Sequence, residues 1–349
     1  MLVSRTFGAW RMGALLVLPM GILLASPIAA KPLKVVATGP DLASLAREVG
    51  GEEVSVESLA KGPQDPHFLE ARPSFIRALF RTDLFAYVGL ALESAWLPPL
   101  IQNARNARIL PGQSGNFDAS EGLPRRGVIE GEVDRSAGDV HPYGSPHYLL
   151  DPVMGLHVAD ALRTRLAELR PEKSAYFDAQ YEDFAARLLG ALVGAPLRDA
   201  IGAEKLREAA LSGDLDATLS PAVQGPGAPA LGGWLGRVAP HQGVKVVADH
   251  DLWPHFAARF GVDVVDFLEP KPGVAPTTRH LTAVAARMRA QEIRLILAAP
   301  YFRVRYAEKV TEASGGVIVP MTHQVGGRKG VDDYLSMIEW NVSQVLDAL

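Results

Sequence analysis

The fold is set by the stretch Leu33-Lys34-Val35-Val36-Ala37-Thr38-Gly39-Pro40 and by the segment that follows it. Its β-branched run predicts a buried strand over Leu33–Thr38 that ends at a Gly-Pro turn. Asp41–Val49 then carries apolar residues at helical spacing and is followed by Gly50-Gly51, which predicts a helix and its end. A strand followed directly by a helix is the repeating unit of a parallel α/β sheet.

The same alternation continues in both halves of the chain. In the N-terminal half we expect strands over Val54–Leu59 and Leu84–Val88, with a helix capped by Ser74 between them. The C-terminal half predicts strands over Val244–Ala248, Val262–Phe267, Ile293–Leu297 and Val317–Val319, and helices over Trp253–Phe260, Thr277–Ala290, Tyr301–Ser314 and Tyr334–Leu349. We find no sequence repeat between the halves, so their similarity is one of architecture.

A long stretch with helical spacing of its apolar residues lies between the halves. It opens at Asp151-Pro152, and the pattern runs from Leu156 to Leu188, past Pro171. We therefore predict one long, rigid helix over residues 151–190. Asp151 is expected to cap it, and a hydrogen bond to the ring N–H of a metal-binding histidine is the alternative role for this residue.

These elements divide the chain into two lobes. We predict an N-terminal α/β lobe over 31–150 and a C-terminal α/β lobe over 191–349, joined by the helix at 151–190. Two loops without elements of their own are expected, a mobile acidic one at 112–144 and a Gly/Pro/Ala-rich one from about Gly213 to Gly233.

The first thirty residues have the composition of an export signal. Arg5 and Arg11 give a positive start, Met12–Ala25 an apolar run, and Ser26–Ala30 a small-residue exit. The apolar run is shorter than the roughly 20 residues that span a membrane. We predict that residues 1–30 are a signal peptide and that the mature protein is periplasmic, with a retained N-terminal anchor as the alternative.

Composition narrows the function classes. The chain has no cysteine, so disulfides and thiolate ligands are excluded and any metal must be bound by nitrogen and oxygen. A formal net charge of -4 argues against nucleic acid as a partner, because nucleic-acid binding favours a basic face. Roughly 320 residues remain after the signal. A chain of this length usually forms more than one hydrophobic core, so we expect two domains.

Histidines in three separate loops are the candidates for chemistry. His67 follows Asp65-Pro66, His147 follows Pro146 ahead of a predicted helix, and His250 ends a predicted strand. Imidazole is the commonest protein ligand for zinc-like metals, and ligands need only converge in space. From the residues alone, ordinary loop or core histidines remain the alternatives to a three-histidine site. For five other histidines the neighbouring residues give no reason to expect a metal ligand: His141, His157, His241, His255 and His280.

The phrases around these histidines resemble those of the zinc/manganese-type solute-binding proteins of ABC importers. In chain order they are Asp65-Pro66-His67, Arg72–Ser74, Gly89–Glu93 with Trp96-Leu97, Ser145–Tyr148 with Leu150–Pro152, Val246–His250 and Glu269–Gly273. The resemblance runs from about Lys34 to the C-terminus. It implies two α/β lobes, each with a parallel sheet flanked by helices, joined by one long helix, with a metal in the cleft between the lobes. It also implies that His67, His147 and His250 are metal ligands.

The fourth ligand position departs from the family pattern. Many members place a carboxylate after a late strand, where this chain reads Pro320–Gly326 and offers His323; another acidic position of the family is Ala299 here. We predict His323 as the fourth ligand, with Asp249, Asp65 or water as alternatives. Three or four neutral imidazoles favour zinc over manganese, which prefers oxygen.

The resemblance therefore implies a periplasmic binding protein and no enzyme activity. We predict that it captures zinc and delivers it to the permease of an ABC importer, that it is a monomer, and that a metallochaperone is a further candidate partner. Manganese or iron is the alternative cargo. A zinc hydrolase, with three histidines and a water on the metal, is the alternative from another class, but no His-Glu-x-x-His or Gly-x-Ser-x-Gly motif is present. A metal-stabilised adhesin is the third possibility.

Overall fold

A computed structural model of the chain describes residues 1–2, 8, 31–129, 131, 141–271 and 273–349. Nearly all of the predicted signal peptide, and part of the predicted acidic loop, lie outside the described residues. Pro32–Leu349 forms one unit and Met1–Lys31 another. Within the described ranges, no helix has both the length and the apolar character needed to cross a membrane.

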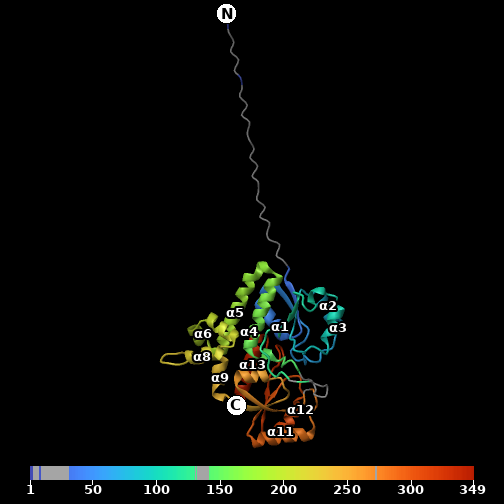
Figure 1. Cartoon of the computed structure of the whole chain (residues 1–349), viewed down its shortest axis with the longest axis vertical. Coiled ribbons are helices and arrows are strands. Elements are labelled where there is room, and N and C mark those ends of the chain that lie inside the picture. The colour runs from blue at the N-terminus through green and yellow to red at the C-terminus, as the bar shows by residue number, and fades with distance from the viewer. Residues whose placement is uncertain (3–7, 9–30, 130, 132–140, 272) are drawn as a thin grey trace. The chain divides into compact units, whose positions relative to one another are not determined.

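The N-terminal lobe is built on a four-stranded parallel sheet (Figure 1). In spatial order its strands are β2 (Val54–Ser58), β1 (Leu33–Ala37), β3 (Leu84–Tyr87) and β4 (Asn116–Asp118). Side chains alternate between the two faces of the central strand, so Val35 and Ala37 face one core and Val36 another, all of them buried. Both faces are thus covered by helices, as parallel sheets require.

The C-terminal lobe repeats this plan. Its sheet is also parallel, and its strands lie in the corresponding order: β6 (Val262–Phe267), β5 (Val244–Ala248), β7 (Leu295–Ala298) and β8 (Val317–Pro320). The predicted strands of both lobes are confirmed to within two residues at each end. The two-lobed α/β fold expected from the sequence is therefore the observed one.

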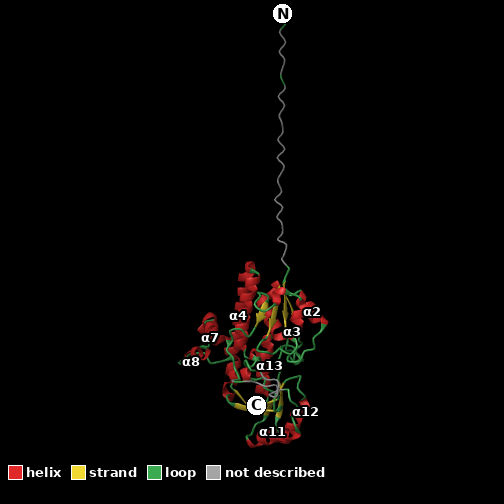
Figure 2. Ribbon diagram, turned by 45° about the vertical axis from the view of Figure 1, so that its right-hand side comes forward, coloured by secondary structure: helices red, strands yellow, loops and turns green. Residues whose placement is uncertain are grey.

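Helices cover both faces of each sheet (Figure 2). In the N-terminal lobe the first face packs on α1 (Pro40–Gly50), and the second packs on α2 (Pro73–Phe80) and α3 (Leu97–Ala104). In the C-terminal lobe one face packs on α10 (Pro254–Phe260) and α13 (Tyr334–Asp347), and the other on α11 (Thr278–Ala290) and α12 (Val304–Ser314). The cap of α2 is Arg72, not the predicted Ser74, because Pro73 already occupies the first turn.

The long helix between the sheets begins later than predicted. It is α5 (Ser174–Val193), and it is preceded by a separate helix, α4 (Pro152–Leu169), which packs beside it (Figure 1). The chain leaves helical geometry at Arg170 and Pro171. Proline lacks the N–H that would continue the hydrogen-bond ladder and its ring clashes with the preceding turn, so the apolar periodicity alone missed the break.

Both predicted loops contain short elements. β4 lies inside 112–144, where it is held by pairing with β3. Leu215–Ala222 forms α8, with Leu215 and Leu219 buried, inside the Gly/Pro-rich stretch. The expectation that these loops have no elements was wrong because short elements gain their stability from tertiary contacts. Four further described helices went unpredicted: α3, α6 (Ala195–Ile201), α7 (Ala203–Ser212) and α9 (Gly233–Val238).

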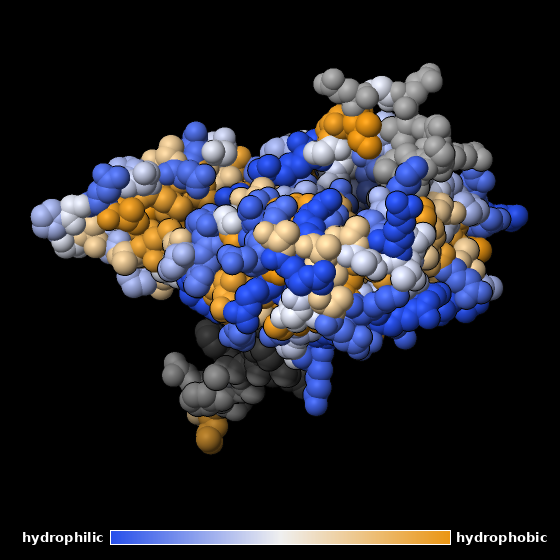
Figure 3. Space-filling model, turned by 90° about the horizontal axis from the view of Figure 1, so that it is seen from below, coloured by the Kyte–Doolittle hydropathy of each residue, from blue (hydrophilic) through white to orange (hydrophobic). Residues whose placement is uncertain are grey.

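One hydrophobic core runs through both lobes. It joins Val35 of the first sheet and Val246 of the second through buried side chains of the helices between them, among them Phe184 of α5 and Phe256 of α10. Two smaller cores lie on the outer faces of the sheets. The face drawn in Figure 3 is largely hydrophilic, with hydrophobic atoms in smaller groups, as expected when most apolar side chains are inside.

Candidate metal centre

The structure brings the four predicted histidines into one cluster. His67, His250 and His323 follow the carboxyl ends of β2, β5 and β8, and His147 directly precedes the short 3-10 helix η4 (Tyr148–Leu150). The side chains are 3% to 6% exposed. Ring centroids lie 5.2 Å apart for His67 and His147, 4.8 Å for His147 and His323, and 6.3 Å for His67 and His250. Loops at the carboxyl ends of parallel strands thus converge from both lobes.

A fifth histidine, His141, belongs to the same cluster, and the sequence interpretation missed it. Its Nε2 lies 3.1 Å from Nε2 of His67, and its ring centroid is 5.6 Å from that of His147. His141 found no support from its surroundings in the sequence because it lies in an irregular stretch. Its proximity in sequence to His147, in the same connection, is the signal that would have found it.

Carboxylates lie behind two of the histidines. Asp65 Oδ1 is 2.7 Å from Nδ1 of His67 and also accepts its backbone N–H, and Glu269 Oε2 is 3.3 Å from Nδ1 of His250. Burial opposes ionisation of Asp65, but the hydrogen bonds from His67 hold the pKa of the Asp65 carboxyl below its usual value. Such partners orient a ring and favour the proton on Nδ1, which puts the lone pair that a metal would bind on Nε2.

Asp249, the other carboxylate considered as a ligand, points into the protein. Its oxygens accept the backbone N–H groups of His250 and Ala299 and the indole N–H of Trp253. Burial raises the pKa of Asp249 to about 7, against which these hydrogen bonds act. Asp249 therefore fixes the end of β5 that carries His250.

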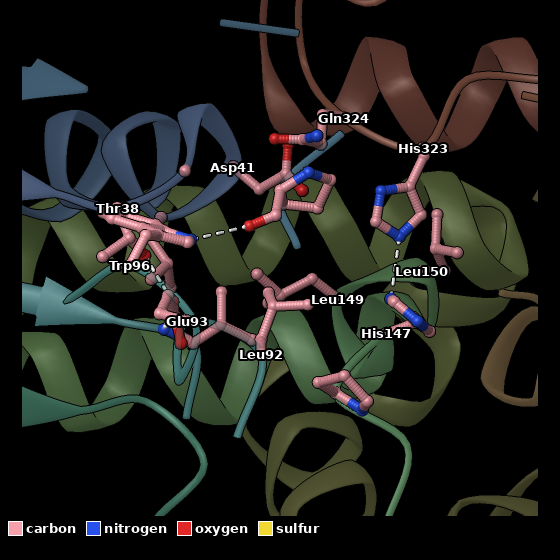
Figure 4. A pocket seen from close by; sticks show the side chains of 15 residues that line it. Thr38, Asp41, Leu92, Glu93, Trp96, His147, Leu149, Leu150, His323 and Gln324 are labelled. Carbon is pink, nitrogen blue, oxygen red and sulfur yellow. Dashed lines mark hydrogen bonds between the residues drawn. The ribbon is translucent and has the colours of Figure 1, made fainter. Parts of the chain in front are cut away.

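Two buried ring nitrogens of the cluster have no hydrogen-bond partner among the described residues. They are Nε2 of His147 and Nδ1 of His323, whose other nitrogens face each other at 3.0 Å (Figure 4). Leaving a buried polar group without a hydrogen-bond partner costs about 1–3 kcal/mol. A bound ion is one kind of partner that would remove this cost.

These imidazoles are neutral near pH 7. Burial, with a smaller contribution from neighbouring histidines, lowers the pKa of His323 to about 3 and that of His141 to about 3, and burial also depresses the pKa of His147 strongly. A neutral imidazole has a lone pair to donate, which is the form that metals bind.

The two lobes are fixed against each other beside the cluster. Asp41 of α1 accepts the backbone N–H of Val325 at 2.6 Å. Gly62 lies so close to the opposite loop that a Cβ there would come within 2.2 Å of the carbonyl carbon of Gly326. A cavity next to this contact, lined by Trp96 among others, reaches His147 and His323 (Figure 4). The loops after β2 and β8 are thus held in a fixed position relative to each other.

We expect the metal-free protein to lose stability as the pH falls below about 6.5. The unfolded chain takes up protons on its histidines there, whereas the folded chain does not, because burial lowers the pKa of His323 to about 3 and that of His255 to about 4. The free energy of unfolding should fall by ~1.4 kcal/mol per pH unit for each such histidine. Urea unfolding at pH 7.5 and pH 5.0 measures this, and equal stability at both would contradict it.

Comparison with known proteins identifies a family. The family model described as "ZnuA: Zinc-uptake complex component A periplasmic" matches residues 35–191 and 235–348. The metal ABC transporter substrate-binding lipoprotein SloC of Streptococcus mutans is 21% identical over 91% of this chain and 90% of its own length. The manganese ABC transporter substrate-binding lipoprotein PsaA of Streptococcus anginosus is 25% identical over 51% of this chain, and the match spans 58% of that relative.

Solved structures share the fold. A crystal structure of ZnuA superposes with a TM-score of 0.64 at 16% identity, covering 91% of this chain and 99% of the other. A manganese-bound periplasmic metal-binding protein from Candidatus Liberibacter asiaticus gives a TM-score of 0.62 at 13% identity, covering 90% and 98%. At these identities the likeness establishes the fold, and the ligand chemistry has to be argued from the residues.

Proposed function

Because this chain belongs to the family of the periplasmic component A of zinc-uptake complexes, we propose that it captures zinc outside the cytoplasmic membrane and delivers it to the permease of an ABC importer. The proposed ligands are His67, His147, His250 and His323. The mature protein works in the periplasm as a monomer, after removal of residues 1–30.

The observation that carries the proposal is the pair of buried, unpartnered nitrogens in the cluster. The contact between Nδ1 of His147 and Nε2 of His323 uses one N–H and one lone pair. Of the two outer nitrogens one therefore presents a lone pair and the other an N–H, and neither has a partner in the described structure. Binding a cation supplies the missing partner and offsets the cost of their burial.

Zinc is proposed over manganese because of the donor set. The carboxylates nearest the cluster, Asp65 and Glu269, lie against ring N–H positions, and Asp249 is engaged by backbone amides. This leaves imidazole nitrogens facing the centre, a set that suits zinc, whereas manganese favours oxygen. The streptococcal relatives are named for manganese or for metal in general, so the argument for zinc rests on this chain's own ligands.

Binding is proposed over zinc hydrolysis because the carboxylates near the cluster already have hydrogen-bond partners. A hydrolytic zinc site needs a base beside the metal-bound water. Here Asp65 accepts from His67, and Glu269 faces His250 and also accepts the backbone N–H of Gly273. The carboxylates at the described histidines therefore orient ligands.

Metal titration of the mature chain tests the proposal. We expect one tightly bound zinc per chain and a manganese affinity at least ~100-fold weaker, since the donors are nitrogen. Zinc should also raise the midpoint of thermal unfolding, because it binds only the folded form. Binding of no divalent metal more tightly than micromolar would overturn the importer function, and manganese binding more tightly than zinc would overturn the choice of cargo.

A further inference from the structure

We propose that His141 is a direct ligand of the captured ion, a fifth imidazole beside the four proposed above, and that His67, His141 and His147 of the N-terminal lobe form a first three-nitrogen set. This rests on the proposed function, since it concerns the same centre, but it assigns a ligand that the family pattern in the sequence did not indicate.

The spacing of the nitrogen atoms supports this set. Two imidazole nitrogens on one tetrahedral zinc, each about 2.0–2.1 Å from the metal, lie roughly 3.3 Å apart. Nε2 of His67 and Nε2 of His141 are 3.1 Å apart, and one ring nitrogen from each of His67, His141 and His147 lies within 4.8 Å of the other two. Small rotations of the rings suffice to place all three around one ion.

The hydrogen bonding of His67 sets the direction of its lone pair. Asp65 accepts at Nδ1 of His67, which places the proton on Nδ1 and leaves the lone pair on Nε2, facing His141. Without an ion, the contact between the two Nε2 atoms requires His141 to donate an N–H there. When an ion binds, the proton of His141 moves to its Nδ1 and both Nε2 atoms donate lone pairs, with no net change in protonation.

His250 is less well placed for first contact than His141. Its ring centroid is 6.3 Å from that of His67, against 5.2 Å for His141, and its ring packs against Phe302 with its Nδ1 near Glu269. His141 is also partly exposed, whereas the other four histidines of the cluster are buried. An ion that first meets the partly exposed His141 is therefore bound by a set supplied wholly by the N-terminal lobe, which His250 and His323 of the C-terminal lobe then complete.

Counting imidazoles on bound zinc tests this ligand. We would compare zinc-loaded wild type, His141→Ala and His141→Gln with His157→Ala, a partly buried histidine of α4 that lies in a different cleft. Zinc K-edge X-ray absorption should show one imidazole fewer in both His141 variants, and chelator competition should show zinc bound ~10-fold more weakly. His157→Ala should match wild type in both measurements.

The outcomes separate the two proposals. If both His141 variants keep the wild-type imidazole count and affinity while His67→Ala loses zinc, His141 is not a ligand and the zinc-capture function stands. If wild type itself binds no zinc, the capture function fails and this inference fails with it. Thermal unfolding of the metal-free variants shows whether a weaker affinity comes from loss of the ligand or from damage to the fold, and only the first supports the proposal.

Discussion

Replacing His67 by alanine will weaken zinc binding by at least ~100-fold. Structural zinc sites contribute about 10–16 kcal/mol from four ligands, so one ligand supplies roughly 3 kcal/mol, which corresponds to about two orders of magnitude in the dissociation constant. Among the proposed ligands His67 has the ring orientation that is best fixed, since Asp65 Oδ1 lies 2.7 Å from its Nδ1. Competition with a chromophoric chelator at fixed pH measures the change.

His323→Ala and His241→Ala complete this experiment. His323 is a proposed ligand with an unpartnered buried nitrogen, and its loss should weaken zinc binding clearly. His241 is exposed, lies in a short 3-10 helix before β5, and should be indistinguishable from wild type. If His323→Ala bound zinc with wild-type affinity, the fourth ligand would be water or a carboxylate and His323 would not be a ligand. Wild-type affinity in His67→Ala would refute the proposed centre.

Asp151→Ala will lower the free energy of unfolding by about 3–5 kcal/mol, the usual cost of leaving one partner of a buried ion pair alone. The Asp151 side chain is 4% exposed and binds Arg259 of α10 through two hydrogen bonds of 2.8 and 3.0 Å. The same carboxylate accepts the N–H of Val153 at 2.9 Å and so caps α4, as the sequence predicted. Urea unfolding of the metal-free protein measures the loss.

Asp183→Ala is the matched control. Asp183 also pairs with an arginine at 2.8 Å, but its side chain is 69% exposed, so its removal should cost less than ~1 kcal/mol. Adding Arg259→Met to Asp151→Ala should restore part of the stability by removing the stranded charge. A loss below ~1 kcal/mol in Asp151→Ala would mean that the pair between α4 and α10 does not join the lobes energetically.

The strands were predictable because each is a short apolar run between turn residues. Val262–Phe267 was placed with both ends correct, since Gly261 precedes it and Glu269-Pro270 lie just beyond it. The break at Arg170 was missed because the apolar positions keep helical spacing across it, although Pro171 marks it. α8 was missed because its stability comes from packing of Leu215 and Leu219, which local composition does not reveal.

The site was predictable only in part for a similar reason. His67, His147 and His250 stand in phrases that resemble a family, and His323 stands where that family often has a carboxylate. His141 has no such phrase, and its place 3.1 Å from His67 is a matter of tertiary structure. Spatial convergence of an irregular loop is a tertiary property, and sequence periodicity carries no information about it.

The core that runs through both lobes limits how the cargo is exchanged. Val35 and Val246, one from each sheet, belong to the same buried apolar cluster, and swinging the lobes apart would bring much of it into contact with water at about 25 cal/mol for each Å² exposed. We therefore expect a wide hinge opening to be costly. If the proposed centre binds an ion, its release should depend on small rotations of imidazole rings and adjustments of the loops that carry them. The lifetime of a loaded state would then be set locally, and a receiving protein could shorten it by distorting those loops alone.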